Sequence, residues 1–209
     1  MMRIDKILEQ WATVYKPLSH SSDKGDKHKS FYRIDAITAE NEFVRNINTA
    51  VSPCMAFSTL IDAQATKENK AVSYLYTIYF MSKQTPGGVG RNFKSDDDSA
   101  FDCKVDLDEM AQDLFAFLLQ LKKAADNGQQ VFYIKSPTAS DVADAVLDKT
   151  EGSIAFNITK DIRQGLRGMD MSSVRWGTLP MLKNGWWVLS FQFEVMEPRQ
   201  LCIVESKYK

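Results

Sequence analysis

The chain contains few of the residue types that usually build active sites. Its 209 residues include two histidines and three cysteines, and the cysteines never form a Cys-x-x-Cys pair. Because Cys54, Cys103 and Cys202 are odd in number and far apart, we expect neither a disulfide framework nor a zinc site. We interpret the thiols as small hydrophobic side chains. Both histidines, His20 and His28, lie in a polar stretch that we predict to be a solvated loop.

Charge of one sign and long apolar runs are also lacking. The formal net charge is −1, whereas a general nucleic-acid-binding protein usually carries a basic excess on one face. The longest uninterrupted apolar run, residues 114–119, is too short to cross a membrane, and the N-terminus has no apolar signal core. We therefore expect a soluble, cytoplasmic protein with no nucleic-acid partner and no membrane association.

The glycines do not form a phosphate-binding motif. Gly87, Gly88 and Gly90 are followed by Arg91, so the lysine and the hydroxyl of a P-loop are missing. The dinucleotide-binding spacing Gly-x-Gly-x-x-Gly is absent as well. We therefore predict that the chain binds no nucleotide or other cofactor.

The strongest positive pattern is a strict alternation over residues 186–195. The apolar face of the expected strand comprises Trp187, Leu189, Phe191, Phe193 and Val195. The polar face carries Ser190, Gln192 and Glu194, which is typical of an antiparallel strand with one buried face. Asn184-Gly185, directly before it, is the preferred two-residue turn of a β-hairpin. The pattern predicts a C-terminal hairpin.

The turn also predicts the register of that hairpin. The expected cross-strand pairs are Lys183 with Trp186, Leu182 with Trp187, Trp176 with Phe193, Arg175 with Glu194, and Val174 with Val195. Pro180 lacks the N–H that a ladder requires. We therefore expect the strand before the turn to lie at a sheet edge or to contain a bulge near residues 178–180.

Two helices are predicted from their apolar stripes. The stripe of the first helix comprises Ile4, Ile7, Leu8, Trp11, Val14, Tyr15 and Leu18. Pro17 should end this helix, and its stripe must dock on its own sheet or on a neighbouring subunit. The second helix, residues 107–125, is apolar over more than half of its circumference and should be largely buried. Asp106 is the expected N-cap, with Glu109 at the capping-box position.

The remaining elements complete an α+β architecture. Residues 53–61 and 71–81 are rich in aromatic and β-branched residues and should form a hairpin joined by the polar segment 62–70. The second of these strands is either central in a covered sheet or supplies tyrosines to a contact surface. We also expect a strand at 131–134 and a turn at 165–168. The chain is thus predicted to be a single α+β domain over its full length, whose mainly antiparallel sheet packs against one long buried helix.

Residues 83–100 form the longest expected loop, and connections of this length are often functional. The loop and the start of the next helix carry Asp96, Asp97, Asp98, Asp102, Asp106, Asp108 and Glu109. Helix capping and solvation are the simplest interpretation, and we predict no metal site. Clustered carboxylates do bind Mg²⁺ or Ca²⁺, and Asp102-Cys103-Lys104 is reminiscent of metal-dependent nucleases. A small metal-dependent enzyme acting through residues 96–102 is therefore an alternative.

Arginines make the stretch after residue 160 the most basic part of the chain. Arg163, Arg167 and Arg175 lie there, and a positive patch opposite the acidic residues 96–109 would suit head-to-tail subunit contacts. An ordinary solvated surface is the simpler interpretation of the same arginines.

Residues 180–195 are the segment of the sequence on which a family resemblance rests. Together with the amphipathic helix, the tyrosine-rich hairpin, the long polar loop and the buried helix, they resemble phage neck and tail-terminator proteins and prophage-encoded proteins of unassigned role. The resemblance implies a non-enzymatic subunit that forms a ring at a tail tube or beneath a capsid portal, and so becomes part of a virion-like particle. It implies copies of itself and other structural proteins as partners, and it transfers no functional residue.

Contacts are therefore expected from the loop at residues 86–98, from the N-terminal helix and from the basic stretch. The candidate contact residues are Trp11, Tyr15, Gly87, Gly88, Arg91, Asp97, Arg167 and Arg175. No catalytic residue is predicted. A soluble regulatory binding module, monomeric until it meets its partner, is a further alternative.

Overall fold

The computed structural model describes residues 4–21, 28–34, 51–65, 71–83, 96–135, 153–182 and 185–198. The helices are α1 (Asp5–Val14), α3 (Asp96–Asp126) and α4 (Lys160–Gly168). The strands are β1 (Phe31–Ile34), β2 (Cys54–Ser58), β3 (Asp62–Ala65), β4 (Ala71–Lys83), β5 (Val131–Lys135), β6 (Ser153–Asn157), β7 (Met169–Leu182) and β8 (Trp186–Pro198).

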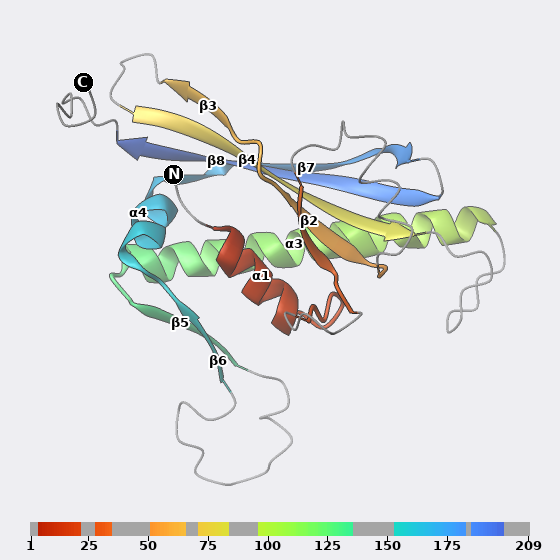
Figure 1. The fold of residues 1–209 in the computed structure, drawn as a ribbon, viewed down its shortest axis with the longest axis horizontal. Coiled ribbons are helices and arrows are strands. Elements are labelled where there is room, and N and C mark those ends of the chain that lie inside the picture. Colours follow the sequence, from red (N-terminus) through yellow and green to blue (C-terminus); the bar gives the residue numbers. More distant parts are fainter. Residues whose placement is uncertain are drawn as a thin grey trace, which may run out of the picture.

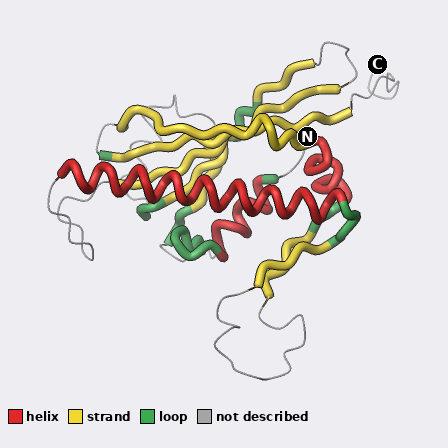
Figure 2. Tube along the Cα trace, turned by 180° about the vertical axis from the view of Figure 1, so that it is seen from behind, coloured by secondary structure: helices red, strands yellow, loops and turns green. Residues whose placement is uncertain are grey.

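A six-stranded sheet forms one layer and the helices form the other (Figure 1). The strand order is β1-β2-β4-β8-β7, and β3 pairs with β4 on the same side as β2. Neighbouring strands are antiparallel except β1 and β2, which are parallel. The 31-residue helix α3 runs along the sheet in both views (Figure 1, Figure 2). The predicted α+β class with a mainly antiparallel sheet is confirmed.

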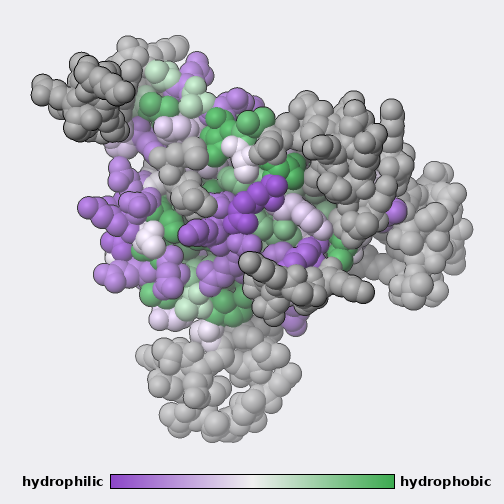
Figure 3. All heavy atoms as spheres, viewed as in Figure 1, coloured by the Kyte–Doolittle hydropathy of each residue, from purple (hydrophilic) through white to green (hydrophobic). Residues whose placement is uncertain are grey.

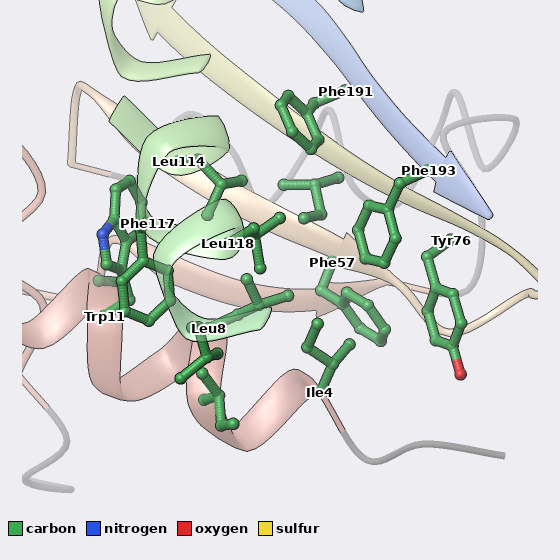
Figure 4. Close-up of a cluster of buried hydrophobic side chains, with 14 of the residues drawn as sticks. Ile4, Leu8, Trp11, Phe57, Tyr76, Leu114, Phe117, Leu118, Phe191 and Phe193 are labelled. Carbon is green, nitrogen blue, oxygen red and sulfur yellow. The ribbon is translucent and has the colours of Figure 1, made fainter. Parts of the chain in front are cut away.

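The main hydrophobic core lies between the helices and one face of the sheet, which we call the helix-covered face. Figure 4 shows the side chains that meet there: Ile4, Leu8, Trp11, Leu114, Phe117, Leu118, Phe57, Tyr76, Phe191 and Phe193. The apolar side of β8 faces this core, as its alternation predicts. Aromatic rings dominate the middle of the sheet, where Tyr76 stacks on Phe193 with ring centroids 5.3 Å apart.

The other side of the sheet, which we call the opposite face, holds a smaller cluster of buried residues. Its members are Ile34, Cys54, Ala56, Met81, Trp186 and Val188. Because β4 contributes Tyr76 to one core and Met81 to the other, this strand is central and covered, in agreement with the first of its two interpretations. Burial raises the pKa of Cys54 to about 12, so this thiol stays protonated, as expected of a small hydrophobic side chain.

The N-terminal helix docks on its own chain. In α1 the residues Ile7, Leu8, Trp11 and Ala12 are buried in the main core. The helix ends at Val14, just before Pro17, whose fixed backbone angle cannot continue it. Hydrophilic residues cover the part of the molecule where α1 lies (Figure 3). The choice between its own sheet and a neighbouring subunit is therefore settled in favour of the sheet.

The C-terminal hairpin is present, but its predicted register is wrong. Leu182 pairs with Trp186, so three residues rather than two separate the strands, and Gly185 has φ +75°. A bulge between Leu179 and Leu182 adds one more residue to β7. The two shifts together amount to two positions. Because two is the side-chain period of a strand, residues 175–179 remain on their predicted faces. Leu182, which is shifted by one position only, pairs with Trp186 of the opposite face instead of Trp187.

The consequences for the predicted pairs are specific. Trp176 faces Phe191 instead of Phe193, and Arg175 faces Gln192 instead of Glu194. The expectation for Pro180 is met in both respects, since β7 is an edge strand and its bulge contains the proline.

Helix α3 begins about ten residues earlier than predicted. The expected N-cap, Asp106, lies inside the helix, and residues 96–100 are helical rather than part of a loop. The physical reason is visible in the sequence: Asp96-Asp97-Asp98-Ser99 places negative charge in the first turn, where it interacts favourably with the helix dipole. Residues 84–95 of the expected loop lie outside the described part of the chain.

Two further segments differ from their prediction. Residues 62–65 form β3 rather than a polar connection. Residues 165–168, predicted as a turn from their two glycines, close helix α4, which begins after the N-cap Thr159 and buries Ile162 and Leu166. The spacing of these two apolar residues is helical, and Gly165 between them is buried. A Cβ on Gly168 would lie 1.9 Å from the carbonyl oxygen of Met196, so this glycine serves packing rather than a turn.

Candidate functional site

Two carboxylates of α3, Asp108 and Asp113, bind other parts of the same chain. Asp108 accepts a hydrogen bond from Trp176 Nε1 at 2.8 Å, and Asp113 accepts one from the Tyr15 hydroxyl at 2.6 Å. These two bonds fasten α3 to β7 and to the end of α1. Among the described residues, no three His, Cys, Asp or Glu side chains are placed to hold a metal ion. The side chains of residues 96–102 lie outside the description.

The predicted contact residues of the N-terminal helix are engaged within the chain. Trp11 is only 3% exposed, so its ring cannot contact a partner, and that prediction is wrong. Its side chain is held by stacking on Tyr15, with ring centroids 4.3 Å apart. Burial and the hydrogen bond to Asp113 raise the pKa of Tyr15.

The other predicted contact residues lie in different parts of the structure or outside the described residues. Gly87, Gly88 and Arg91 lie outside the described residues, and Asp97 is described only as part of the backbone of α3. Arg167, in the last turn of α4, is exposed. Arg175 is exposed on β7, where its Nε donates to Gln192 Oε1 at 3.1 Å. The complementarity between these arginines and the acidic stretch remains a prediction.

A polar network crosses the opposite face of the sheet. The Arg175–Gln192 bond continues to Thr77, because Gln192 Nε2 lies 3.4 Å from Thr77 Oγ1. One row further along, Ser73 Oγ donates to Glu194 Oε2 at 2.9 Å. These contacts join β7, β8 and β4 through side chains, as cross-strand polar pairs do. The network gives this face a polar, hydrogen-bonded surface.

Four polar side chains form a second cluster between α1 and β1. Arg33 donates from Nε to Asp5 Oδ2 at 2.9 Å and from its terminal nitrogen to Glu9 Oε2 at 2.8 Å. Its guanidinium also lies over the ring of Phe31, 5.2 Å from the centroid. Asp5 is 5% exposed, and a buried carboxylate needs such a partner. The cluster therefore pins the helix to the edge of the sheet.

His20 completes this cluster in a defined protonation state. Its Nδ1 accepts hydrogen bonds from the backbone N–H groups of Ser30 and Phe31, both at 3.1 Å. The neutral ring must therefore carry its proton on Nε2, which lies 3.9 Å from Glu9 Oε1. Burial lowers the pKa of His20. The prediction of a solvated loop is wrong for His20, which is 5% exposed, whereas His28 is exposed.

The described element that stands apart from the body is the β5–β6 hairpin, which projects below it in Figure 1 and again in Figure 2. Its base is anchored by aromatic contacts. Phe156 lies 4.9 Å from Phe117 of α3, and Phe132 lies 6.0 Å from it, measured between ring centroids. The outer face of the hairpin carries Tyr133, whose side chain is 51% exposed opposite Ala155.

The two edges of this hairpin differ. On the β6 edge, Gln10 of α1 donates from Nε2 to the carbonyl oxygen of Ala155 at 2.7 Å. On the β5 edge no strand is paired within the described part of the chain. An unpaired strand edge is a template for another strand, so the chemistry that this site offers is backbone hydrogen bonding beside an exposed tyrosine. The prediction of a strand at 131–134 is confirmed, but the sequence does not indicate its exposed edge.

Comparisons with known proteins identify no relative for this arrangement. No protein-family model, no curated protein and no solved structure matches the chain. Across the described residues, no helix is long and apolar enough to cross a membrane.

Proposed function

We propose that the chain is a non-enzymatic structural subunit that acts through contacts with copies of itself and with other structural proteins. The proposed class is the phage or prophage neck or tail terminator, cytoplasmic before assembly and part of a virion-like particle afterwards. The observation that carries the proposal is the projecting β5–β6 hairpin, with Tyr133 exposed beside a strand edge that pairs with no other described strand. Such an edge is suited to binding another chain by strand addition.

The treatment of the other strand edges supports this interpretation. Proteins protect exposed edges with short strands, prolines, bulges or covering groups. β1 and β3 have four residues each, and β7 contains a bulge around Pro180. The β6 edge is occupied by Gln10. On β5 only the terminal Lys135 is charged, so its edge is the least protected of those described.

The proposal is tested by light scattering coupled to size exclusion, over a wide range of protein concentrations and at two salt concentrations. We expect a defined oligomer whose fraction rises with concentration. If the acidic and basic segments make the contact, about 1 M salt should dissociate it, because the screening length is then about 3 Å. A monomer under every condition, with no binding to other structural proteins encoded nearby, would contradict the proposal.

A further inference from the structure

We propose that β5 pairs with β5 of a second copy of this chain, antiparallel and centred on Tyr133. This inference rests on the proposed function and adds the occupant and the geometry of the contact. It begins from the backbone groups that β5 turns away from β6.

The hydrogen-bond pattern of the hairpin identifies those groups. Ile158 N donates to Gln130 O at 2.7 Å, so this pair is of the hydrogen-bonded kind. In an antiparallel ladder such pairs alternate with pairs whose N–H and C=O groups point outward. The alternation assigns Val131, Tyr133 and Lys135 to the outward set of β5. The same rule assigns Ala155 to the outward set of β6, and the bond from Gln10 to its carbonyl confirms the assignment.

The outward N–H and C=O groups of β5 can form hydrogen bonds with the same groups of β5 in a second copy. An antiparallel pairing centred on Tyr133 places Val131 opposite Lys135 of the second copy, and each of these pairs is again of the hydrogen-bonded kind. No lysine then faces a lysine. The two Tyr133 rings become direct cross-strand neighbours on the exposed face, an arrangement that favours aromatic pairs. On the inner face Phe132 meets Ile134 of the copy, which extends the apolar side of the hairpin.

Within the described part of the chain, no second strand pairs with β5. α1 lies on the β6 side of the hairpin, where Gln10 reaches Ala155, and the hairpin projects from the body (Figure 1). The strand has five residues, so the pairing buries less area than the roughly 1,000 Å² of a stable interface. We therefore expect a weak dimer with a dissociation constant between about 1 μM and about 1 mM. A contact with twofold symmetry closes at two copies, so a ring needs a second contact elsewhere.

The experiment compares one substitution on each edge of the same hairpin. Tyr133→Pro removes the central outward N–H of β5 and leaves the β5–β6 ladder intact, because proline is tolerated where the N–H faces solvent. Ala155→Pro makes the matched change on β6 and keeps the carbonyl that Gln10 binds. Sedimentation equilibrium should show at least a tenfold loss of association for Tyr133→Pro and little change for Ala155→Pro. Circular dichroism verifies that both variants remain folded.

Cross-linking tests the register without relying on a disruptive change. Cα atoms of a hydrogen-bonded pair lie about 5.5 Å apart, within disulfide range. Under mild oxidation Tyr133→Cys should form covalent dimers above the background set by the native cysteines in the parent chain. Val131→Cys alone should not, because its two copies would lie more than about 13 Å apart, whereas a mixture of Val131→Cys and Lys135→Cys should cross-link.

The outcomes separate this inference from the proposed function. If the parent chain associates but Tyr133→Pro associates equally well and Tyr133→Cys forms no covalent dimer, β5 pairing is overturned while a structural subunit with another contact stands. If the parent chain is monomeric up to about 1 mM, the pairing is overturned, and the proposed function then depends on binding to other structural proteins. Dimers that cross-link through Val131→Cys alone would overturn the register.

Discussion

The two faces of the central sheet are built from the same strands in different ways. On the helix-covered face β4 and β8 place Tyr76, Phe191 and Phe193 in a core shared with α1 and α3. On the opposite face they contribute to a cluster of six buried residues and then to the Arg175–Gln192–Thr77 network. Packing thus dominates the first face, and side-chain hydrogen bonds contribute over much of the second.

The difference indicates where stability and adaptability are located. Burying one large apolar side chain contributes about 1.5–3 kcal/mol, while an exposed polar pair contributes about 0.2–1 kcal/mol. The helix-covered face should therefore determine whether the chain folds. The opposite face can change its side chains at little cost, provided that its buried cluster is kept.

The largest effect is expected from emptying the middle of the helix-covered face. Phe191 is fully buried and stacks on Trp176, with ring centroids 5.8 Å apart. Phe191→Ala should lower the free energy of unfolding by about 3–5 kcal/mol, from lost burial plus the cavity left behind. Gln192→Ala, the next residue on the opposite face, should cost less than about 1 kcal/mol. Urea unfolding measures both, and similar losses would contradict the contrast.

A pair of glycines gives the next test. A Cβ on Gly168, at the end of α4, would lie 1.9 Å from the carbonyl oxygen of Met196, a backbone atom of β8. Gly168→Ala must therefore displace α4 from the sheet and should cost about 1–3 kcal/mol. A Cβ on Gly177, on the opposite face of β7, would meet nothing within 4 Å. Gly177→Ala should be neutral or stabilising by up to about 1 kcal/mol, as thermal or urea unfolding would show.

Most of the difference between the faces could be predicted from alternation in the sequence. The pattern of residues 186–195 identifies the apolar side of β8, and a register error of two positions does not disturb it. The register itself could not be predicted: Pro180 indicated an edge strand or a bulge, but the number of extra residues in the bulge and in the turn cannot be read from composition. The helical start at Asp96 was missed for a related reason, since acidic residues suit both a solvated loop and a first helical turn.

The candidate site was predictable only in part. The strand at β5 was expected, but its projection from the body and its unpaired edge depend on where α1 docks. Gln10 occupies the β6 edge through a contact between residues 145 positions apart in the chain, while β5 pairs with no second strand among the described residues. Trp11 shows the reverse error: an amphipathic stripe is the same whether it faces its own core or a partner, so sequence alone left the choice open.

A smaller and pH-dependent effect is expected on the helix-covered side, where His20 lies beside Phe31. Protonation at Nδ1 would oppose the two backbone N–H groups that donate to it. Glu9 on α1 favours the charged ring, whereas Lys29, His28 and Arg33 oppose it, and burial lowers the pKa below the ordinary value of 6.5. The unfolded chain therefore binds more protons. This contribution to stability is complete above pH 6.5 and is lost as pH falls from there through the lowered pKa.

Substitution of each histidine in turn isolates that contribution. In His20→Asn the amide oxygen can accept the same backbone bonds but does not titrate, so the stability loss between about pH 6.5 and pH 5 should diminish. His28→Asn keeps His20 and its two backbone hydrogen bonds and removes only a cause of the lowered His20 pKa that is smaller than burial, so most of the loss should remain. Urea unfolding across this pH range measures both variants. An equal pH dependence in the parent chain and His20→Asn would show that His20 does not determine it.

The smallest expected effect comes from the two tryptophans, one on each face of the hairpin. Trp176, on the helix-covered side, donates from its indole to Asp108, whereas the buried indole N–H of Trp186 has no acceptor among the described residues. Trp176→Phe should cost about 1.5 kcal/mol, as expected for a lost bond to a charged acceptor.

Trp186→Phe loses side-chain volume but also removes an unsatisfied buried donor. Such a donor destabilises the parent chain by about 1–3 kcal/mol, so the two effects offset each other. The second variant should stay within about 1 kcal/mol of the parent, and unfolding followed by far-ultraviolet circular dichroism avoids the altered fluorescence. A larger loss for Trp186→Phe than for Trp176→Phe would mean that packing outweighs hydrogen bonding on the opposite face as well.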